Sequence, residues 1–173
     1  MKCLPKTLVV SLFAALAFTV SADNLLTDNK FSEAGGWLSW VEKPALDAGG
    51  SLTLQDGKAV AKSPAVKNQV RWNLQLFKDI AIEADKSYKV KFNANSDKAG
   101  KITIGYILSK APYADYGSTT IDVAPGEKVY ECILAVKKDK DGKYDAPRSL
   151  RFWLGELKDA TITVSDVSIE ELK

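Results

Sequence analysis

Two short segments of the chain carry an unusual set of polar and aromatic side chains. Residues 70–76 (VRWNLQL) and 150–155 (LRFWLG) alternate apolar and polar positions, and successive side chains of a strand point to opposite faces. One face of each strand is then apolar. Trp72 is predicted on the apolar face of the first strand. The opposite faces carry two of the three arginines, two amides and a tryptophan: Arg71, Asn73, Gln75, Arg151 and Trp153. Amides and guanidinium groups hydrogen-bond hydroxyls and an indole stacks on flat rings, so these five residues predict a face that binds a sugar chain.

Further aromatic residues are predicted near the edge of this face. Tyr113 and Tyr116 lie in the segment 111–117 (APYADYG), which has neither helical nor strand periodicity. Trp40 lies three residues after Trp37, so in a strand the two side chains would point to opposite faces. Trp37 is predicted in the core and Trp40 at the edge of a cleft. The alternative for Trp153 is ordinary packing under a loop.

The acidic residues and the absence of histidine argue against catalysis. The chain has no histidine, which excludes Ser-His-Asp, Cys-His and histidine-based zinc sites. Glycoside hydrolysis usually needs two carboxylates about 5–9.5 Å apart. The acids are predicted largely in turns, and none on the two faces described above. We therefore expect a protein that holds its ligand without cleaving it.

The segments that position these residues are short strands separated by turn residues. Asp56-Gly57 lies between two alternating runs and predicts a tight hairpin. About eight to ten such runs and little helical pattern predict an all-β fold, a two-sheet antiparallel β-sandwich of the jelly-roll type. The segment 80–86 is compatible with either a turn or a continued strand.

The N-terminal segment predicts export. Residues 1–22 combine a basic start, an apolar stretch and the small-residue site Val20-Ser21-Ala22, which is typical of a signal peptide and too short to span a membrane. The domain is therefore expected over 23–173, in a secreted or periplasmic, monomeric protein. Its basic and acidic residues then balance without a basic stripe, so no nucleic-acid partner is expected. Cys132 is predicted to be a buried small apolar residue.

The ordered motifs resemble a known family. Asn24-Leu25-Leu26, a segment 28–32 (DNKFS), Gly36-Trp37, the 72–76 run and the 152–155 run with a later 166–169 segment (DVSI) are similar to the carbohydrate-binding modules of families four, nine and twenty-two. The resemblance implies a galactose-binding-like jelly roll that binds one glycan chain in a cleft across a concave sheet. It places Gln75 on the binding-face glutamine, and Trp153 where the family often has glutamine.

The resemblance also implies partners and a structural ion. It implies a polysaccharide ligand of the β-glucan or xylan class and a separate glycoside hydrolase as a possible associate. It further implies a structural calcium near the chain termini, with Asp166 as the matching ligand and Glu33 or Asp28 as weaker candidates. The alternative is a structural or adhesive β-sandwich that binds a protein partner. A groove lined by the predicted residues would favour glycan, and a flat apolar patch elsewhere would favour protein.

Overall fold

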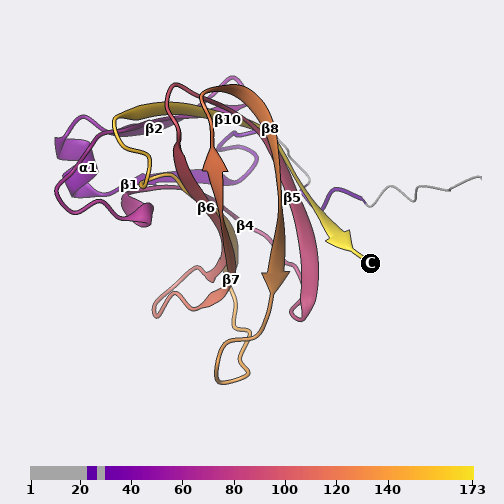
Figure 1. Cartoon of the computed structure of the whole chain (residues 1–173). Helices are drawn as coiled ribbons and strands as arrows, with labels where there is room; N and C mark the ends of the chain where they lie inside the picture. The colour runs from indigo at the N-terminus through magenta and orange to yellow at the C-terminus, as the bar shows by residue number, and fades with distance from the viewer. Residues whose placement is uncertain (1–22, 27–29) are drawn as a thin grey trace, which may run out of the picture.

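The computed structural model describes residues 23–26 and 30–173, so the predicted signal peptide and Asp28 lie outside the described residues. In the described part of the chain, ten strands form two five-stranded sheets whose neighbouring strands are antiparallel. The two sheets pack face to face (Figure 1). This arrangement confirms the predicted all-β sandwich of the jelly-roll type.

The chain crosses repeatedly between the two sheets. Sheet 1 has the order β1 (Trp37–Val41), β4 (Leu74–Asp79), β9 (Arg148–Trp153), β6 (Gly100–Leu108), β7 (Asp115–Val123). Sheet 2 has the order β2 (Ser51–Gln55), β3 (Lys58–Ser63), β10 (Ala160–Leu172), β5 (Lys86–Ser96), β8 (Gly126–Val136). Of these described strands, only the pairs β2–β3 and β6–β7 are consecutive strands of one sheet. A five-residue helix, α1 (Lys43–Asp47), follows β1 and carries Pro44 in its first turn, where proline is tolerated. The sequence analysis did not predict this helix.

The core lies between the sheets and is built by the predicted alternation. Leu74 and Leu76 of β4 and Leu150 and Phe152 of β9 are fully buried. Trp37 is also fully buried, with its ring centroid 6.3 Å from that of Phe152, so its predicted core position is confirmed. Side chains at alternate positions of the same strands must then point away from sheet 2.

The predicted hairpin is present between β2 and β3. Gln55 and Lys58 are register partners, and Asp56 and Gly57 have φ values of 51° and 74°. Positive φ at both central residues is what a type I′ turn requires. Residues 80–83 are neither helix nor strand, which agrees with the turn alternative for that segment.

The prediction of a continuous strand over 70–76 was wrong at its beginning. Arg71–Asn73 form a single 3-10 turn, η1, and the strand begins only at Leu74. Asn73 donates its backbone N–H to the carbonyl of Val70 in this turn. Side chains on a 3-10 turn do not alternate between two faces, so alternation does not assign the faces of Trp72 and Asn73.

The described part of the chain contains no helix long and apolar enough to cross a membrane.

Candidate functional site

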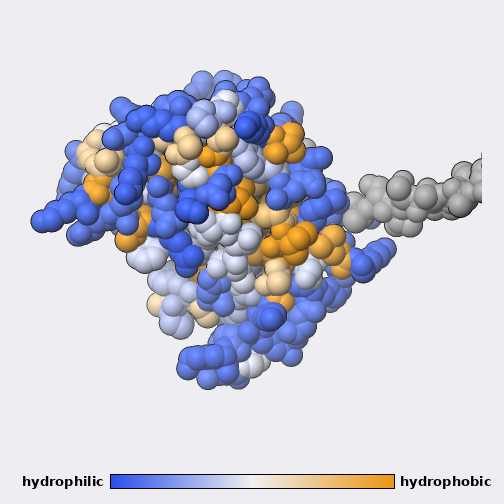
Figure 2. Space-filling view, in the orientation of Figure 1, coloured by the Kyte–Doolittle hydropathy of each residue, from blue (hydrophilic) through white to orange (hydrophobic). Residues whose placement is uncertain are grey.

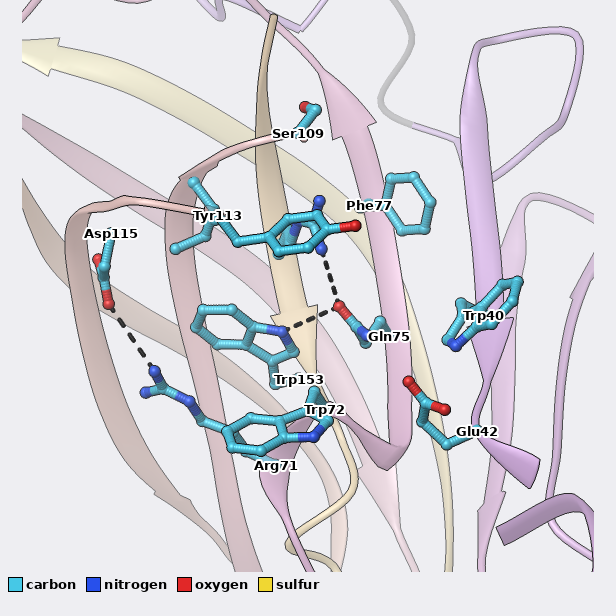
Figure 3. A pocket seen from close by; sticks show the side chains of 12 residues that line it. Trp40, Glu42, Arg71, Trp72, Gln75, Phe77, Ser109, Tyr113, Asp115 and Trp153 are labelled. Atoms are coloured by element: carbon cyan, nitrogen blue, oxygen red, sulfur yellow. Dashed lines mark hydrogen bonds and ion pairs between the residues drawn. The ribbon is translucent and has the colours of Figure 1, made fainter. Parts of the chain in front are cut away.

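A pocket of about 600 Å³ lies on the outward face of sheet 1. All five strands of the sheet, η1 and the adjoining loops contribute to it (Figure 3). Pockets of this size commonly hold small organic ligands or segments of larger ones. Its lining residues are Trp40, Glu42, Arg71, Trp72, Gln75, Phe77, Ile107, Ser109, Tyr113, Asp115, Arg151 and Trp153.

The strand register places the central residues of the pocket in one row. Trp40 of β1 is the register partner of Gln75 of β4, and Gln75 is the partner of Trp153 of β9. Directly opposed residues of antiparallel strands lie on the same face, about 4.5–5.5 Å apart. Figure 3 shows Gln75 between the two tryptophans. The sequence predicted that Gln75 and Trp153 share a binding face, and the structure brings both into the pocket.

Trp153 forms the floor of the pocket and is only 5% exposed. Gly105 lies against the outer edge of the six-membered ring of Trp153, where an added Cβ would come within 2.7 Å of Cζ3 and 2.9 Å of Cη2. The Arg71 guanidinium lies over the ring, 4.2 Å from its centroid. The indole N–H donates to Gln75 Oε1 at 3.1 Å. The prediction of Trp153 as a stacking platform needs correction, because its ring is buried and Arg71 already stacks on it.

Three other aromatic side chains are exposed around the pocket. Trp40, Trp72 and Tyr113 are 54%, 47% and 57% exposed. Tyr113 has a φ of 57° in the loop between β6 and β7. The prediction of Trp72 as a core residue was wrong, because η1 turns its side chain outward into the pocket lining. The strict alternation of residues 70–76 concealed this, and no other sequence signal revealed it.

Arg151 is partly buried and fixed by neutral acceptors. Its Nε donates to Ser149 Oγ at 2.9 Å, and one terminal nitrogen donates to Gln75 Oε1 at 2.9 Å. Its guanidinium carbon lies 5.1 Å from the Phe77 ring centroid and 5.8 Å from that of Tyr113. Burial lowers the pKa of the Arg151 guanidinium, partly offset by the negative potential of Tyr113 and Asp79.

Two carboxylates line the pocket, contrary to the expectation of an acid-free face. Glu42 follows β1 and Asp115 begins β7. Asp115 accepts hydrogen bonds from the Gly117 N–H and Ser118 Oγ, both at 2.9 Å, and lies 3.8 Å from an Arg71 nitrogen. The sequence analysis missed both acids because each lies at the end of a strand. Alternation within one segment does not show which residues of different strands come together there.

Two predicted site residues do not reach the pocket. Asn73 is buried, and its side-chain amide donates to the Asn68 carbonyl at 3.4 Å. Tyr116 is 2% exposed, and its hydroxyl accepts the Asp145 N–H at 2.9 Å. Tyr116 fails as a rim residue because it already belongs to β7, where its ring packs 4.8 Å from that of Tyr144. Arg71, Gln75, Arg151, Trp153, Tyr113 and Trp40 all line the pocket.

The candidate calcium ligands do not form an acidic cluster. Asp166 Oδ2 accepts hydrogen bonds from Asn93 Nδ2 and Ser165 Oγ, both at 2.9 Å. Among residues 23–26 and 30–173, no group of three or more Asp, Glu, His or Cys could hold a metal ion. A structural calcium through Asp166 and Glu33 therefore stays a prediction from the family resemblance.

Comparisons with known proteins identify the fold. No family model matches the sequence, and neither does any curated protein. Solved structures do match. A carbohydrate-binding module, CBM4, is 18% identical with a TM-score of 0.65, over 85% of this chain and 99% of that one. The second N-terminal cellulose-binding domain of Cellulomonas fimi β-1,4-glucanase C is 17% identical with a TM-score of 0.65, over 88% and 97%. The N-terminal cellulose-binding domain of the same enzyme is 16% identical with a TM-score of 0.56, over 85% and 94%.

This protein thus has the β-sandwich fold of carbohydrate-binding modules. The fold implied by the sequence resemblance is confirmed. At these identities the likeness concerns the fold, and the ligand must be argued from the pocket itself.

Proposed function

We propose that this is a secreted, non-catalytic carbohydrate-binding protein that holds a polysaccharide of the β-glucan or xylan class on sheet 1. The observation that carries the proposal is the ring of half-exposed aromatics, Trp40, Trp72 and Tyr113, around a pocket with an oriented amide at its centre. Rigid aromatic side chains bury large areas at low conformational cost. Their exposure here leaves ring faces available for pyranose rings.

Gln75 supplies a directed hydrogen-bonding group. Its Oε1 accepts from both Arg151 and Trp153 Nε1, which fixes the orientation of the side-chain amide. In the described part of the chain Gln75 Nε2 donates no hydrogen bond, so its N–H groups remain able to donate to a hydroxyl. A free donor next to open ring faces suits a sugar, which offers both apolar ring faces and hydroxyl oxygens.

The two pocket acids do not make a hydrolytic pair. Asp115 accepts hydrogen bonds at both carboxylate oxygens and also lies beside Arg71. Such a carboxylate is held as an acceptor, whereas a general acid must donate a proton. The second carboxylate of a glycosidase acts as an ionised nucleophile or base facing the acid across the scissile bond, whereas Figure 3 shows Glu42 and Asp115 on opposite sides of the pocket. This supports binding without cleavage, even though the pocket contains carboxylates.

Location and partners follow from the sequence. The signal-like segment 1–22 supports export to the periplasm or the exterior, and action as a monomer beside a separate glycoside hydrolase fits a binding protein without its own catalytic pair. Affinity in the micromolar to millimolar range, about −8 to −4 kcal/mol, is expected for such a site.

The test is titration calorimetry of the purified protein against soluble β-glucan, xylan, mannan and starch. One polymer class should bind, and Trp40→Ala and Trp72→Ala should each weaken binding about tenfold, because a stacking aromatic contributes about 1 kcal/mol or more. Ile133→Ala is the matched control, since Ile133 is equally exposed but lies on β8 of sheet 2. Failure of every polymer to bind would refute the proposal.

The protein-partner alternative has an observation of its own. Val129 and Ile133 of edge strand β8 are exposed. Figure 2 shows a mainly hydrophilic face with apolar side chains gathered where β5, β8 and the end of β10 lie in Figure 1. Exposed apolar patches can mark protein contacts. The protein-partner alternative would be supported if no glycan bound and Ile133→Ala abolished association with a purified partner.

A further inference from the structure

Arg151 has more hydrogen-bonding capacity than its surroundings use. A guanidinium has five N–H donors, and the described residues accept two from Arg151, through Ser149 Oγ and Gln75 Oε1. Both acceptors are uncharged. The remaining donors belong to a partly buried group in the lining of the pocket. The charge is thus held in place but incompletely paired.

No carboxylate neutralises Arg151 within the described part of the chain. It forms no ion pair within 4 Å there, although Asp79 influences it electrostatically and Tyr113 lies over it. The Asp79 carboxylate accepts instead from Ser109 Oγ at 2.8 Å. Removing a charge from water without an opposite charge is costly, and the lowered pKa of Arg151 reflects this burial.

The other two arginines differ from Arg151 in position or in charge pairing. Arg148 lies outside the pocket lining and donates to the Tyr106 hydroxyl and to two backbone carbonyls, while its guanidinium stacks 3.9 Å from the Tyr144 ring centroid. Arg71 lies in the pocket, and its ion pair with Asp115 spans 3.8 Å, longer than a hydrogen bond. Two incompletely paired guanidinium groups therefore line one pocket.

We propose that the ligand is an acidic polysaccharide whose carboxylate binds the free N–H groups of Arg151. This rests on the proposed function and names the sugar class within it: a chain bearing uronic acid units, such as an acidic xylan. Arginine binds carboxylates through two parallel hydrogen bonds. Phe77 and Tyr113 flank the guanidinium and shield this pairing from water.

The remaining pocket charges are compatible with such a ligand. Asp115 accepts hydrogen bonds from the Gly117 N–H and Ser118 Oγ and lies 3.8 Å from Arg71. Glu42 lies beside Trp40 and Trp72, away from the Tyr113 side of the pocket (Figure 3). A carboxylate bound at Arg151 is therefore separated from Glu42 by the row that contains Gln75, and the neutral part of the sugar chain can lie over that row.

The test compares a xylan bearing glucuronic acid with the same polymer after reduction of its carboxyl groups to alcohols. Calorimetry on the unmodified protein should show at least about tenfold weaker binding to the reduced polymer, in line with the strength of charge-assisted hydrogen bonds. Arg151→Gln should abolish the difference in affinity between the acidic and the reduced polymer, and because Arg151 also orients Gln75 the readout is this difference and not the affinity for either polymer alone. Arg151→Lys should recover only part of the difference.

Each other outcome has a defined meaning. Equal binding of both polymers would overturn the carboxylate inference and leave the proposed function intact. Binding of neither, together with failure of the neutral panel, would overturn both. Equal enhancement by a sulfated xylan would show general attraction of anions and would also overturn the inference. The polymer comparison needs no variant, so it decides the matter even if Arg151→Gln does not fold.

Discussion

Gly105→Ala is the most informative single substitution, because two opposing effects predict opposite changes in the stability of the fold. Gly105 does not have a positive φ, so alanine fits its backbone. With enough space, the substitution would stabilise the fold by about 0.4–1 kcal/mol by reducing the entropy of the unfolded chain. The structure predicts the opposite, because the new Cβ would lie 2.7 Å and 2.9 Å from two indole carbons of Trp153 and 3.4 Å from Ile107 Cδ1.

Trp153 has little freedom to move away from that methyl group. The Arg71 guanidinium packs on its ring, and the indole N–H donates a hydrogen bond to Gln75 Oε1. Overpacking of this kind costs about 1–3 kcal/mol. In a domain of this size each kcal/mol lowers Tm by about 2–4 °C, so we expect a decrease of about 2–12 °C by calorimetry. Displacement of Arg71 and Gln75 should also weaken binding of any pocket ligand.

The control is the double variant Gly105→Ala with Trp153→Phe. Phenylalanine lacks the benzo part of the indole, so the alanine methyl should cost less beside it than beside tryptophan. A double-mutant cycle should show this as a favourable coupling energy. If Gly105→Ala raises Tm in the presence of Trp153, the packing argument for the pocket floor is wrong.

Three further predictions test the assignment of individual residues. Trp72→Ala should change the free energy of unfolding by less than about 0.5 kcal/mol in urea titrations, as for an exposed residue; a loss of about 3–5 kcal/mol would restore the core interpretation. Tyr116→Phe removes the acceptor of the Asp145 N–H and should cost about 1 kcal/mol of stability without altering glycan affinity, and any large change in affinity would return Tyr116 to the site. Burial raises the pKa of the Cys132 thiol to about 11, so the thiol should resist alkylation at pH 8 until the protein unfolds. Because the native state keeps the proton that the unfolded thiol loses near its ordinary pKa, wild type should lose stability relative to Cys132→Ala between about pH 9 and 11, and parallel pH curves for the two proteins would contradict this.

The sequence determined the fold class and part of the site through local patterns. Alternation places every second residue of a strand on one face whatever its neighbours are, so the buried faces of β4 and β9 and the outward positions of Gln75, Arg151 and Trp153 were predictable. The Asp56-Gly57 hairpin was predictable because its backbone requires residues that tolerate positive φ.

Only the tertiary structure decided which side chains meet. A single 3-10 turn, η1, moved Trp72 out of the core and Asn73 out of the site, because the local pattern does not distinguish that turn from an alternating strand. The pairing of five strands brought Glu42 and Asp115 to the pocket, although they are far apart along the chain. Likewise, the packing of Trp153 against Gly105 and Arg71 arises from contacts between distant segments, and such contacts depend on strand register and side-chain volume, which alternation within one segment does not encode.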